Sequence, residues 1–278
     1  MPVGSKAGIM YGLPKIHKEG SPIRPIISSI GTYTHKLAQY LDEIIKPGLS
    51  NNEFMIKDTF DFVNIMSETK INQDEYIVSF DVSSLFTNVP VNETIEIILN
   101  KLFKRKFDTF HGLSRRNLRE LLEICTQKSI FCFDGQYYEQ IDGVSMGCRL
   151  GPTFANYFMD WLEKRNFAKL KRLGVILYKR YVDDTFVILK SIQCATQVLN
   201  FLNTLHPNIK FTTEKEKDGC ITFLDVLVKR KRDHLQTEMY RKPTLIGVYL
   251  HWDSLTSRKY KIRLIKCLLN RIWRICSK

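Results

Sequence analysis

An Asp-Asp pair separates two apolar runs in the middle of the chain, in the stretch YKRYVDDTFVILK. Val, Ile, Phe and Tyr favour strands, whereas Asp is depleted in strands and common in turns. The stretch therefore predicts a hairpin with Asp183 and Asp184 at its tip. A solvated turn also explains the pair, since a chain of this length contains about one Asp-Asp pair by chance. The pair becomes informative if other segments bring acidic groups to the same place.

The charge of the chain narrows the class of partner. Its 278 residues include 42 Lys and Arg against 29 Asp and Glu, a formal charge of +13. This excess of positive charge favours a polyanionic binding partner, such as nucleic acid or an acidic membrane surface. Because we find neither a transmembrane-length apolar run nor a signal-peptide core, we expect an intracellular protein without a membrane partner. The seven cysteines form no C-x-x-C pair, so we expect reduced thiols and no zinc site.

The order of the expected elements is typical of an α+β fold with antiparallel strands and helices on one face. The stretch DEYIVSFDVSSLF is expected to contain a buried strand that ends at Asp81. Helices are expected over residues 34–45, 115–127, 153–170 and 191–206, and another is expected to begin at Asn92 or Glu93, with Asn92 as N-cap, and to end at residue 107. Hairpins are expected over 129–141 and 208–231, with Asp134-Gly135 and Asp218-Gly219 at their turns. The segment 258–278, with eight basic residues and no acidic one, is expected to form a basic amphipathic helix.

If the strands around Asp81 and the Asp-Asp pair are neighbours in one sheet, three carboxylates meet. At such close range they repel one another and raise each other's pKa, unless cations lie between them. Mg²⁺ prefers oxygen ligands, and two such ions are typical of phosphoryl-transfer sites. From spacing alone, a strand-end cap and a solvated turn explain these residues equally well.

Three nearby segments favour a nucleotide site. Phe86, five residues after Asp81, would lie beside the ions and exclude a ribose 2′-hydroxyl, although it also fits a core position. Gly147 lies in a glycine-rich strand-to-helix connection that a substrate can approach closely, and an ordinary loop is the alternative. Lys15 and Arg24 lie on a Pro-flanked segment that could cover a triphosphate, and solvated surface charge is the alternative.

The ordered motifs resemble those of reverse transcriptases along nearly the whole chain. They are YGLPKIHK, RPIIS, FDVSSLFTNVP, GVSMGCRLGPTFAN, YVDD, FLDV and YRKPT. This set is most similar to the Penelope-like retroelement enzymes, which are relatives of telomerase reverse transcriptase. The resemblance implies a right-hand polymerase whose antiparallel palm sheet packs on helices. It also implies an RNA-directed DNA polymerase that extends a primer 3′-hydroxyl with dNTPs on an RNA template.

The resemblance assigns the catalytic and nucleotide-binding roles to individual residues. The residues expected to hold two Mg²⁺ ions, with Mn²⁺ as a substitute, are Asp81, Asp183, Asp184 and the backbone carbonyl of Val82. Phe86 is expected to act as the steric gate at the dNTP sugar. Arg24 and Lys15 are expected to contact the triphosphate, and Gly147 to form part of the surface under the nucleotide or template. A lysine would protonate the departing pyrophosphate, and the candidates that remain open are Lys210, Lys215 and Lys217.

The resemblance also divides the chain into parts. Residues 1–75 are expected in the fingers, 76–92 in a palm strand with the first catalytic Asp, 93–128 in fingers and palm helices, 129–232 in the palm, and 233–278 in the primer grip and thumb start. Nucleic-acid contacts are expected from Tyr240, Arg241, Lys242, Arg258, Lys259 and Lys261. The expected partners are an RNA template, a DNA primer and dNTPs, and the expected location is nuclear. The oligomeric state stays open.

Departures from the family pattern leave two alternatives open. Cys148-Arg149 stand where family members usually have Ser-Pro, and Arg149 brings charge and bulk to the nucleotide floor. The family's longer N-terminal region and C-terminal GIY-YIG endonuclease are not found in these residues, so target cleavage is not implied and the question of a fragment stays open. Both features are compatible with a catalytically inactive nucleic-acid-binding remnant. An RNA-dependent RNA polymerase shares the palm chemistry but usually has a polar residue where this chain has Phe86.

Overall fold

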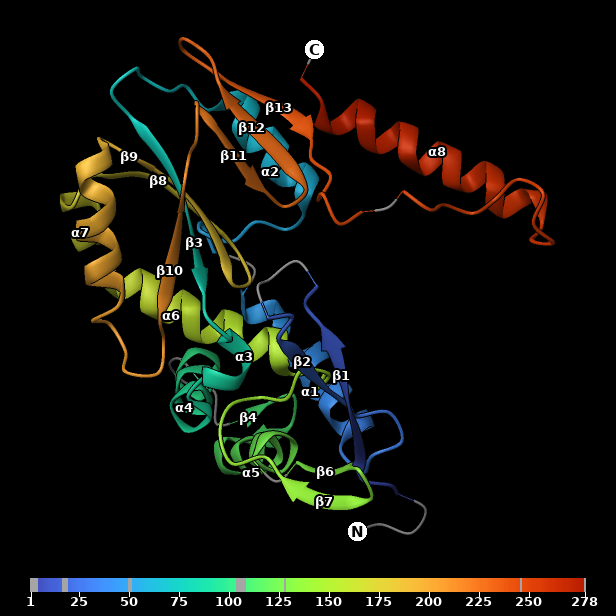
Figure 1. Ribbon diagram of the computed structural model, residues 1–278. Coiled ribbons are helices and arrows are strands. Elements are labelled where there is room, and N and C mark those ends of the chain that lie inside the picture. Colours follow the sequence, from blue (N-terminus) through green and yellow to red (C-terminus); the bar gives the residue numbers. More distant parts are fainter. Residues whose placement is uncertain are drawn as a thin grey trace. The chain divides into compact units, whose positions relative to one another are not determined.

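The computed structural model describes residues 5–16, 20–49, 52–103, 109–127, 129–245 and 247–277. The chain forms two compact units. The first unit consists of Met1–Phe54, Val82–Lys169 and Phe201–Phe211, and the second of Met55–Asp81, Leu170–Asn200 and Thr212–Lys278. Each unit is built from segments that are distant in sequence, as the colours of Figure 1 show.

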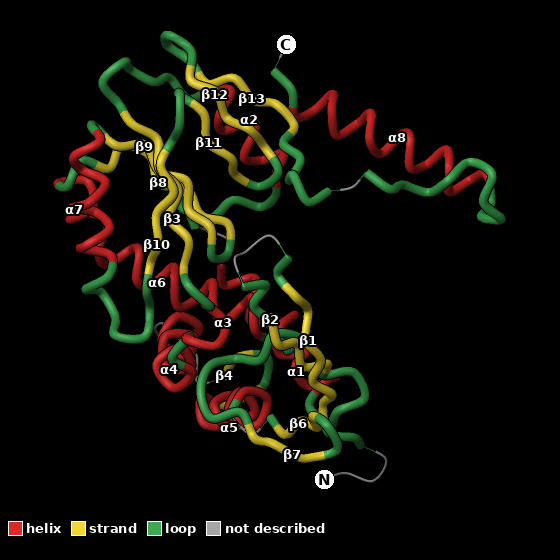
Figure 2. Tube along the Cα trace, in the orientation of Figure 1, coloured by secondary structure: helices red, strands yellow, loops and turns green. Residues whose placement is uncertain are grey.

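A four-stranded antiparallel sheet carries the YVDD hairpin. Its strand order is β10-β3-β9-β8, and the bounds are β3 Tyr76–Val82, β8 Val175–Tyr181, β9 Asp184–Leu189 and β10 Phe211–Lys215. The β-branched and aromatic residues of these segments favour extended backbone. The predicted strand, turn and strand around the Asp-Asp pair are confirmed. Figure 2 shows these strands in yellow.

The second unit has a continuous apolar core on one face of this sheet. The core lies between the sheet, helix α2 (Thr59–Glu68), and a second sheet of β11 (Cys220–Phe223), β12 (Val226–Arg230) and β13 (Leu235–Met239). Three rings meet there, since the centroid of Phe62 lies 5.1 Å from that of Phe186 and 4.7 Å from that of Phe223. The last helix, α8 (Arg258–Ile275), packs on α2 and β13.

The opposite face of the same sheet is also buried. Its residues include Val78, Phe80, Val187 and Leu189, all almost without exposed surface. The expectation of helices on one face is therefore too simple. A strand whose neighbouring residues are all apolar, such as Ile77 and Val78, is typical of a sheet that is covered on both faces.

The hairpin predicted over residues 208–231 is wrong in its pairing. Asp218-Gly219 does form a turn, but it joins β10 to β11, which belong to different sheets and share only the isolated bridge Lys217–Cys220. The true hairpin joins β11 to β12 through Leu224 and Asp225, whose φ values of 48° and 61° are those of a type I′ turn. A turn motif specifies a chain reversal, whereas long-range packing selects the partner strand.

The first unit is mainly helical, with a four-stranded sheet of order β2-β1-β6-β7. Its strands are β1 (Gly8–Pro14), β2 (Ile23–Ser28), β6 (Ile130–Phe133) and β7 (Gln136–Glu139), with a small ribbon of β4 (Thr109–Phe110) and β5 (Leu113–Ser114). Its helical elements are α1 (His35–Ile45), η1 (Lys46–Leu49), α3 (Leu85–Asn88), α4 (Val91–Leu102) and α5 (Arg115–Thr126). Helix α6 (Gly151–Arg172) belongs to this unit except for its last residues, whereas α7 (Ile192–Leu202) lies mainly in the second unit.

Local turn and helix signals in the first unit are mostly confirmed. Asp134 and Gly135 have φ values of 49° and 74°, as the predicted type I′ turn requires. The helices predicted at 34–45, 115–127 and 153–170 are present. Asn92 is not an N-cap, because α4 begins at Val91 with Pro90 as its cap. Residues 104–107 of the helix predicted there lie outside the described residues.

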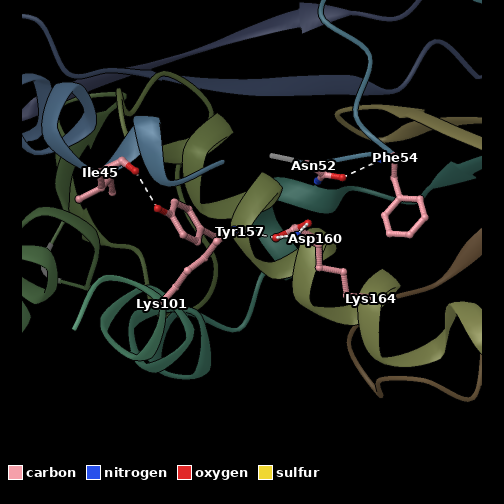
Figure 3. Close-up of polar contacts among 7 residues, drawn as sticks. All are labelled: Ile45, Asn52, Phe54, Lys101, Tyr157, Asp160 and Lys164. Carbon is pink, nitrogen blue, oxygen red and sulfur yellow. Dashed lines mark hydrogen bonds and ion pairs between the residues drawn. The ribbon is translucent and has the colours of Figure 1, made fainter. Parts of the chain in front are cut away.

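Buried polar contacts fix α6 against its neighbours in the first unit (Figure 3). Asp160 on α6 is 3% exposed, and the ammonium groups of Lys101 and Lys164 lie within 3.0 Å of its Oδ2 atom. One turn earlier, the Tyr157 hydroxyl donates to the carbonyl of Ile45 at 2.7 Å. Burial raises the pKa of Tyr157, so this hydroxyl stays a donor. The contacts join α6 to α1 and α4.

Gly48 is expected to be intolerant of a side chain, because an added Cβ would collide with the buried Tyr157 hydroxyl. We expect Gly48→Ala to lower the free energy of unfolding by about 1–3 kcal/mol. In a Tyr157→Phe background the same change should cost clearly less, because the colliding oxygen is gone. Urea unfolding of the four proteins measures this coupling. An equal cost in both backgrounds would contradict the collision.

Candidate active site

The YVDD turn is a two-residue loop with an unusual backbone. Tyr181 at the end of β8 pairs with Asp184 at the start of β9, so that Val182 and Asp183 form the loop. Val182 has a φ of 55°. Glycine is the usual residue at a first loop position with positive φ, and a β-branched residue there is strained by about 1–3 kcal/mol. The strain lies in the turn that carries both acidic residues.

The third predicted carboxylate lies directly across the sheet. In the β3–β9 register Asp81 is the partner of Asp184, and Asp183 is the next residue along the chain. Side chains directly opposite each other share a face and have Cβ atoms about 4.5–5.5 Å apart. Ile77, four residues before Asp81 in β3, lies on the same face of the sheet and belongs to the apolar core. The pairing thus brings the three acidic residues together, while their catalytic roles stay predictions.

The electrostatics of the hairpin reflect this crowding. The pKa of Asp184 is raised to about 6, first by burial and then by the negative charges of Asp183, Asp81 and Glu214. The positive charge of Lys242 acts in the opposite direction. An anionic cluster of this kind favours a bound proton or a bound cation.

The carboxylates of Asp81, Asp183 and Asp184 are suitable ligands for a hard divalent cation, since Mg²⁺ prefers carboxylate oxygens. Within the described ranges, however, no three Asp, Glu, His or Cys side chains are gathered closely enough to hold an ion as they stand. Metal binding by Asp81, Asp183 and Asp184 therefore stays a prediction. Val82 follows Asp81 in β3 and is buried, and its role as a backbone ligand stays a prediction.

Several of the predicted nucleotide-binding residues lie close together in the first unit. The Phe86 ring packs near Gly151 at the start of α6, and its carbonyl accepts a hydrogen bond from Val144 N at 2.8 Å. Gly147 has a φ of 118°, and a Cβ there would collide with the carbonyl of Ile27 in β2. Only glycine permits this approach. The loop before α6, Phe86 and β2 form one cluster.

The β1–β2 hairpin carries the two predicted triphosphate contacts. Arg24 in β2 pairs with Leu13 in β1 and is exposed, while Lys15 follows β1 and is partly buried. The backbone N–H of Lys15 donates to the Pro22 carbonyl at 2.9 Å, which closes the hairpin. Arg24 is three residues from Ile27, so β2 links this exposed cation to the Gly147 loop.

The unusual Cys148-Arg149 pair fits the loop without disturbing it. Cys148 is buried, its Sγ lies 3.9 Å from the Cys125 carbonyl, and burial raises its pKa. Arg149 is exposed. The cysteine thus fills a core position while the arginine adds charge at the surface of the loop.

The strand pairing separates the three candidate lysines. The Lys210 carbonyl accepts a hydrogen bond from Ser83 N at 2.8 Å, just after Val82. Lys215 and Lys217 flank Glu216, whose N–H donates to Ile77 at the other end of β3. The register therefore places Lys210 at the Val82 end of β3, where its ammonium donates to the Asn203 carbonyl at 3.3 Å, and its role stays a prediction.

The predicted nucleic-acid contacts of the second unit fall into two groups. Tyr240, Arg241 and Lys242 follow β13, and the charge of Lys242 acts on Asp184. Arg258 and Lys259 are exposed at the start of α8, as a phosphate contact requires. Lys261 differs, because it is 8% exposed and its ammonium donates to the carbonyls of Trp252 and Ser254. Its hydrogen bonds give it a structural role in the loop before α8.

Sequence reasoning missed one charged residue of the hairpin. Arg180 is fully buried, and its Nη1 donates to the Val182 carbonyl at 2.9 Å. The only signal in the sequence was a basic residue inside a strand that is otherwise mostly apolar and aromatic. Among the helices that the structure describes, none is long and apolar enough to cross a membrane.

Solved structures with a similar fold are polymerases. Telomerase from Candida albicans in complex with a TWJ fragment of telomeric RNA matches with a TM-score of 0.64 at 13% identity, over 97% of this chain and 52% of that one. Apo telomerase from Candida tropicalis, truncated from its C-terminal domain, matches with a TM-score of 0.61 at 13% identity, over 84% and 55%. The RNA-dependent RNA polymerase of BmCPV matches with a TM-score of 0.55 at 11% identity, over 80% and 21%.

These likenesses confirm the predicted polymerase fold. The chain spans about half the length of the telomerase chains it matches. No curated protein is similar enough in sequence to match. Residues 16–239 match the family model described as reverse transcriptase (RNA-dependent DNA polymerase). This match covers most of the sequence, from the residue after Lys15 to the end of β13, and the chain therefore belongs to the reverse transcriptase family.

Proposed function

We propose that this chain is the RNA-directed DNA polymerase core of a Penelope-like retroelement. The observation that carries the activity is the β3–β9 register, which sets Asp81 opposite Asp184 and beside Asp183. The Penelope-like assignment is supported by the order of the sequence motifs and agrees with the telomerase-like fold. The substrates are dNTPs, and the partners are an RNA template and a DNA primer. By the same resemblance, we propose a nuclear location.

The three carboxylates, with the Val82 carbonyl, would hold two Mg²⁺ ions, for which Mn²⁺ could substitute. When bound, such ions activate the attacking hydroxyl and neutralise charge on the transferred phosphate. The chain positions these ligands on a rigid sheet whose register is locked by a core. Preorganised positioning of this kind is the main source of catalysis in phosphoryl transfer.

The remaining residues would bind and select substrates. Phe86, packed beside Gly151, would exclude the ribose 2′-hydroxyl, and Gly147 would allow the nucleotide close to the backbone. Arg24 would bind the triphosphate, with Lys15 in support, and Lys210 is the preferred donor of a proton to pyrophosphate. Contacts to primer and template would come from exposed or charged groups near the hairpin and on α8, namely Tyr240, Arg241, Lys242, Arg258 and Lys259.

The first prediction concerns the carboxylates. We expect Asp183→Asn combined with Asp184→Asn to reduce extension of an oligo-dT primer on poly-rA by at least about 1,000-fold, because the ligands for the ions are lost. Asp218→Asn, an exposed turn residue of the same unit, is the matched control. Equal extension by the double variant and the control would refute the assignment. Salt-sensitive RNA binding without incorporation by the unmodified chain would instead identify an inactive remnant.

The second prediction concerns sugar selection. We expect Phe86→Ala to raise the use of rNTPs relative to dNTPs by about 10- to 100-fold, since the ring no longer blocks the 2′-hydroxyl. Phe131→Ala removes another partly buried ring of the first unit and controls for a non-specific loss of packing. The ratio of kcat/KM for the two nucleotide types measures the effect. An unchanged ratio would remove the gate role, and a ratio that already favours rNTPs would indicate an RNA polymerase.

The third prediction concerns pH. Since the folded protein holds a proton on Asp184 more tightly than the unfolded chain, this group favours folding at low pH, and the advantage is lost as pH rises through about 6. In metal-free buffer, Asp184→Asn should therefore raise Tm relative to the unmodified protein more at pH 7.5 than at pH 5. Thermal unfolding at both pH values measures this difference. A constant difference would show that folding does not raise the pKa of Asp184.

A further inference from the structure

Arg180 is a buried cation attached to the YVDD turn. Its side chain has no exposed surface, and its Nη1 donates to the carbonyl of Val182 at 2.9 Å. Its backbone carbonyl accepts a hydrogen bond from Ile56 N at 2.8 Å, so the residue is also held by the segment before α2. Burying a guanidinium is unfavourable unless its donors are paired. The turn carbonyl provides one of these pairings.

The register places Arg180 behind the acidic face of the sheet. It pairs with Thr185, which pairs with Phe80 in β3, and all three are buried. Because side chains alternate along a strand, this row faces away from Asp81 and Asp184. Arg180 therefore acts on the site through the backbone of the turn and not by touching a substrate.

The turn itself needs such support. Val182 has a φ of 55°, a conformation that β-branched residues rarely adopt. Strained backbone persists only where the surroundings over-determine it. A charge-assisted hydrogen bond to the carbonyl of the strained residue is a suitable device, since it is stronger than a neutral one. An apolar residue at position 180 would fill a similar volume but remove this hydrogen bond.

We propose that Arg180 is a positioning residue that holds the Val182-Asp183 turn in the conformation that presents Asp183 and Asp184. This role rests on the proposed function. Lysine is a poor replacement, because its single ammonium on a flexible stem lacks the planar fork of arginine. The competing explanation is that Arg180 contributes only to the general stability of the core.

A rescue experiment separates the two explanations. We expect Arg180→Met to lower kcat for dNTP incorporation by about 10- to 100-fold with little change in KM, because misplaced ligands slow the chemical step. Arg180→Lys should recover little. Adding Val182→Gly to Arg180→Met should raise kcat about tenfold above that of Arg180→Met alone, since glycine adopts positive φ without support. The proposal would be overturned if Val182→Gly did not raise kcat in the Arg180→Met background. It would also be overturned if the loss of kcat in Arg180→Met equalled the loss of folded protein.

A measurement without catalysis tests the same role if the chain proves inactive. In metal-free protein, hydrogen exchange of the peptide spanning residues 180–186 should be about tenfold faster in Arg180→Met and should slow again with Val182→Gly. The Leu224-Asp225 hairpin of the same unit is the internal reference and should not change. If Arg180→Met does not fold, Arg180→Lys replaces it in both measurements. Unchanged exchange at the turn, or an equal increase in the reference hairpin, would reject the proposal.

Discussion

The pairing of β3 with β9 is the constraint on which the site depends. It sets Asp81 opposite Asp184, and a slip of one residue would turn one of these side chains to the other face. The register is held by the core on the acidic face, where Ile77, Phe186 and Ile188 pack with the second sheet. Apolar packing at one end of the strands thus determines the geometry of charged groups at the other end.

Two unfavourable features are concentrated at the hairpin. Val182 has a left-handed backbone, and Asp184 is a partly buried carboxylate beside two others. Neither would persist in an isolated peptide, because a solvated turn would relax and spread its charges. Here the strands on both sides are anchored, and Arg180 binds the turn carbonyl from behind. Strain and charge crowding at one place are typical of functional sites.

The nucleotide-side residues depend on a different kind of contact. Gly147 approaches the backbone of β2 so closely that no side chain fits, and Phe86 lies against the start of α6. The same loop accepts Cys148 in its core and Arg149 at its surface. The departures from the family pattern are therefore compatible with the polymerase fold.

Local chemistry in the sequence determined the elements and the candidate residues. The apolar runs around Asp183-Asp184 and the Asp134-Gly135 turn were sufficient, because strand propensity and turn geometry depend on neighbouring residues. The partner of each strand, however, was decided by tertiary packing, as the wrong pairing after Asp218-Gly219 shows. Tertiary structure alone also decided which cations are buried, since Arg180 and Lys261 are buried while Lys179 and Lys259, of the same charge, keep exposed surface. The physical reason is that burial and strand partnership arise from contacts between segments distant in the chain, which no local pattern specifies.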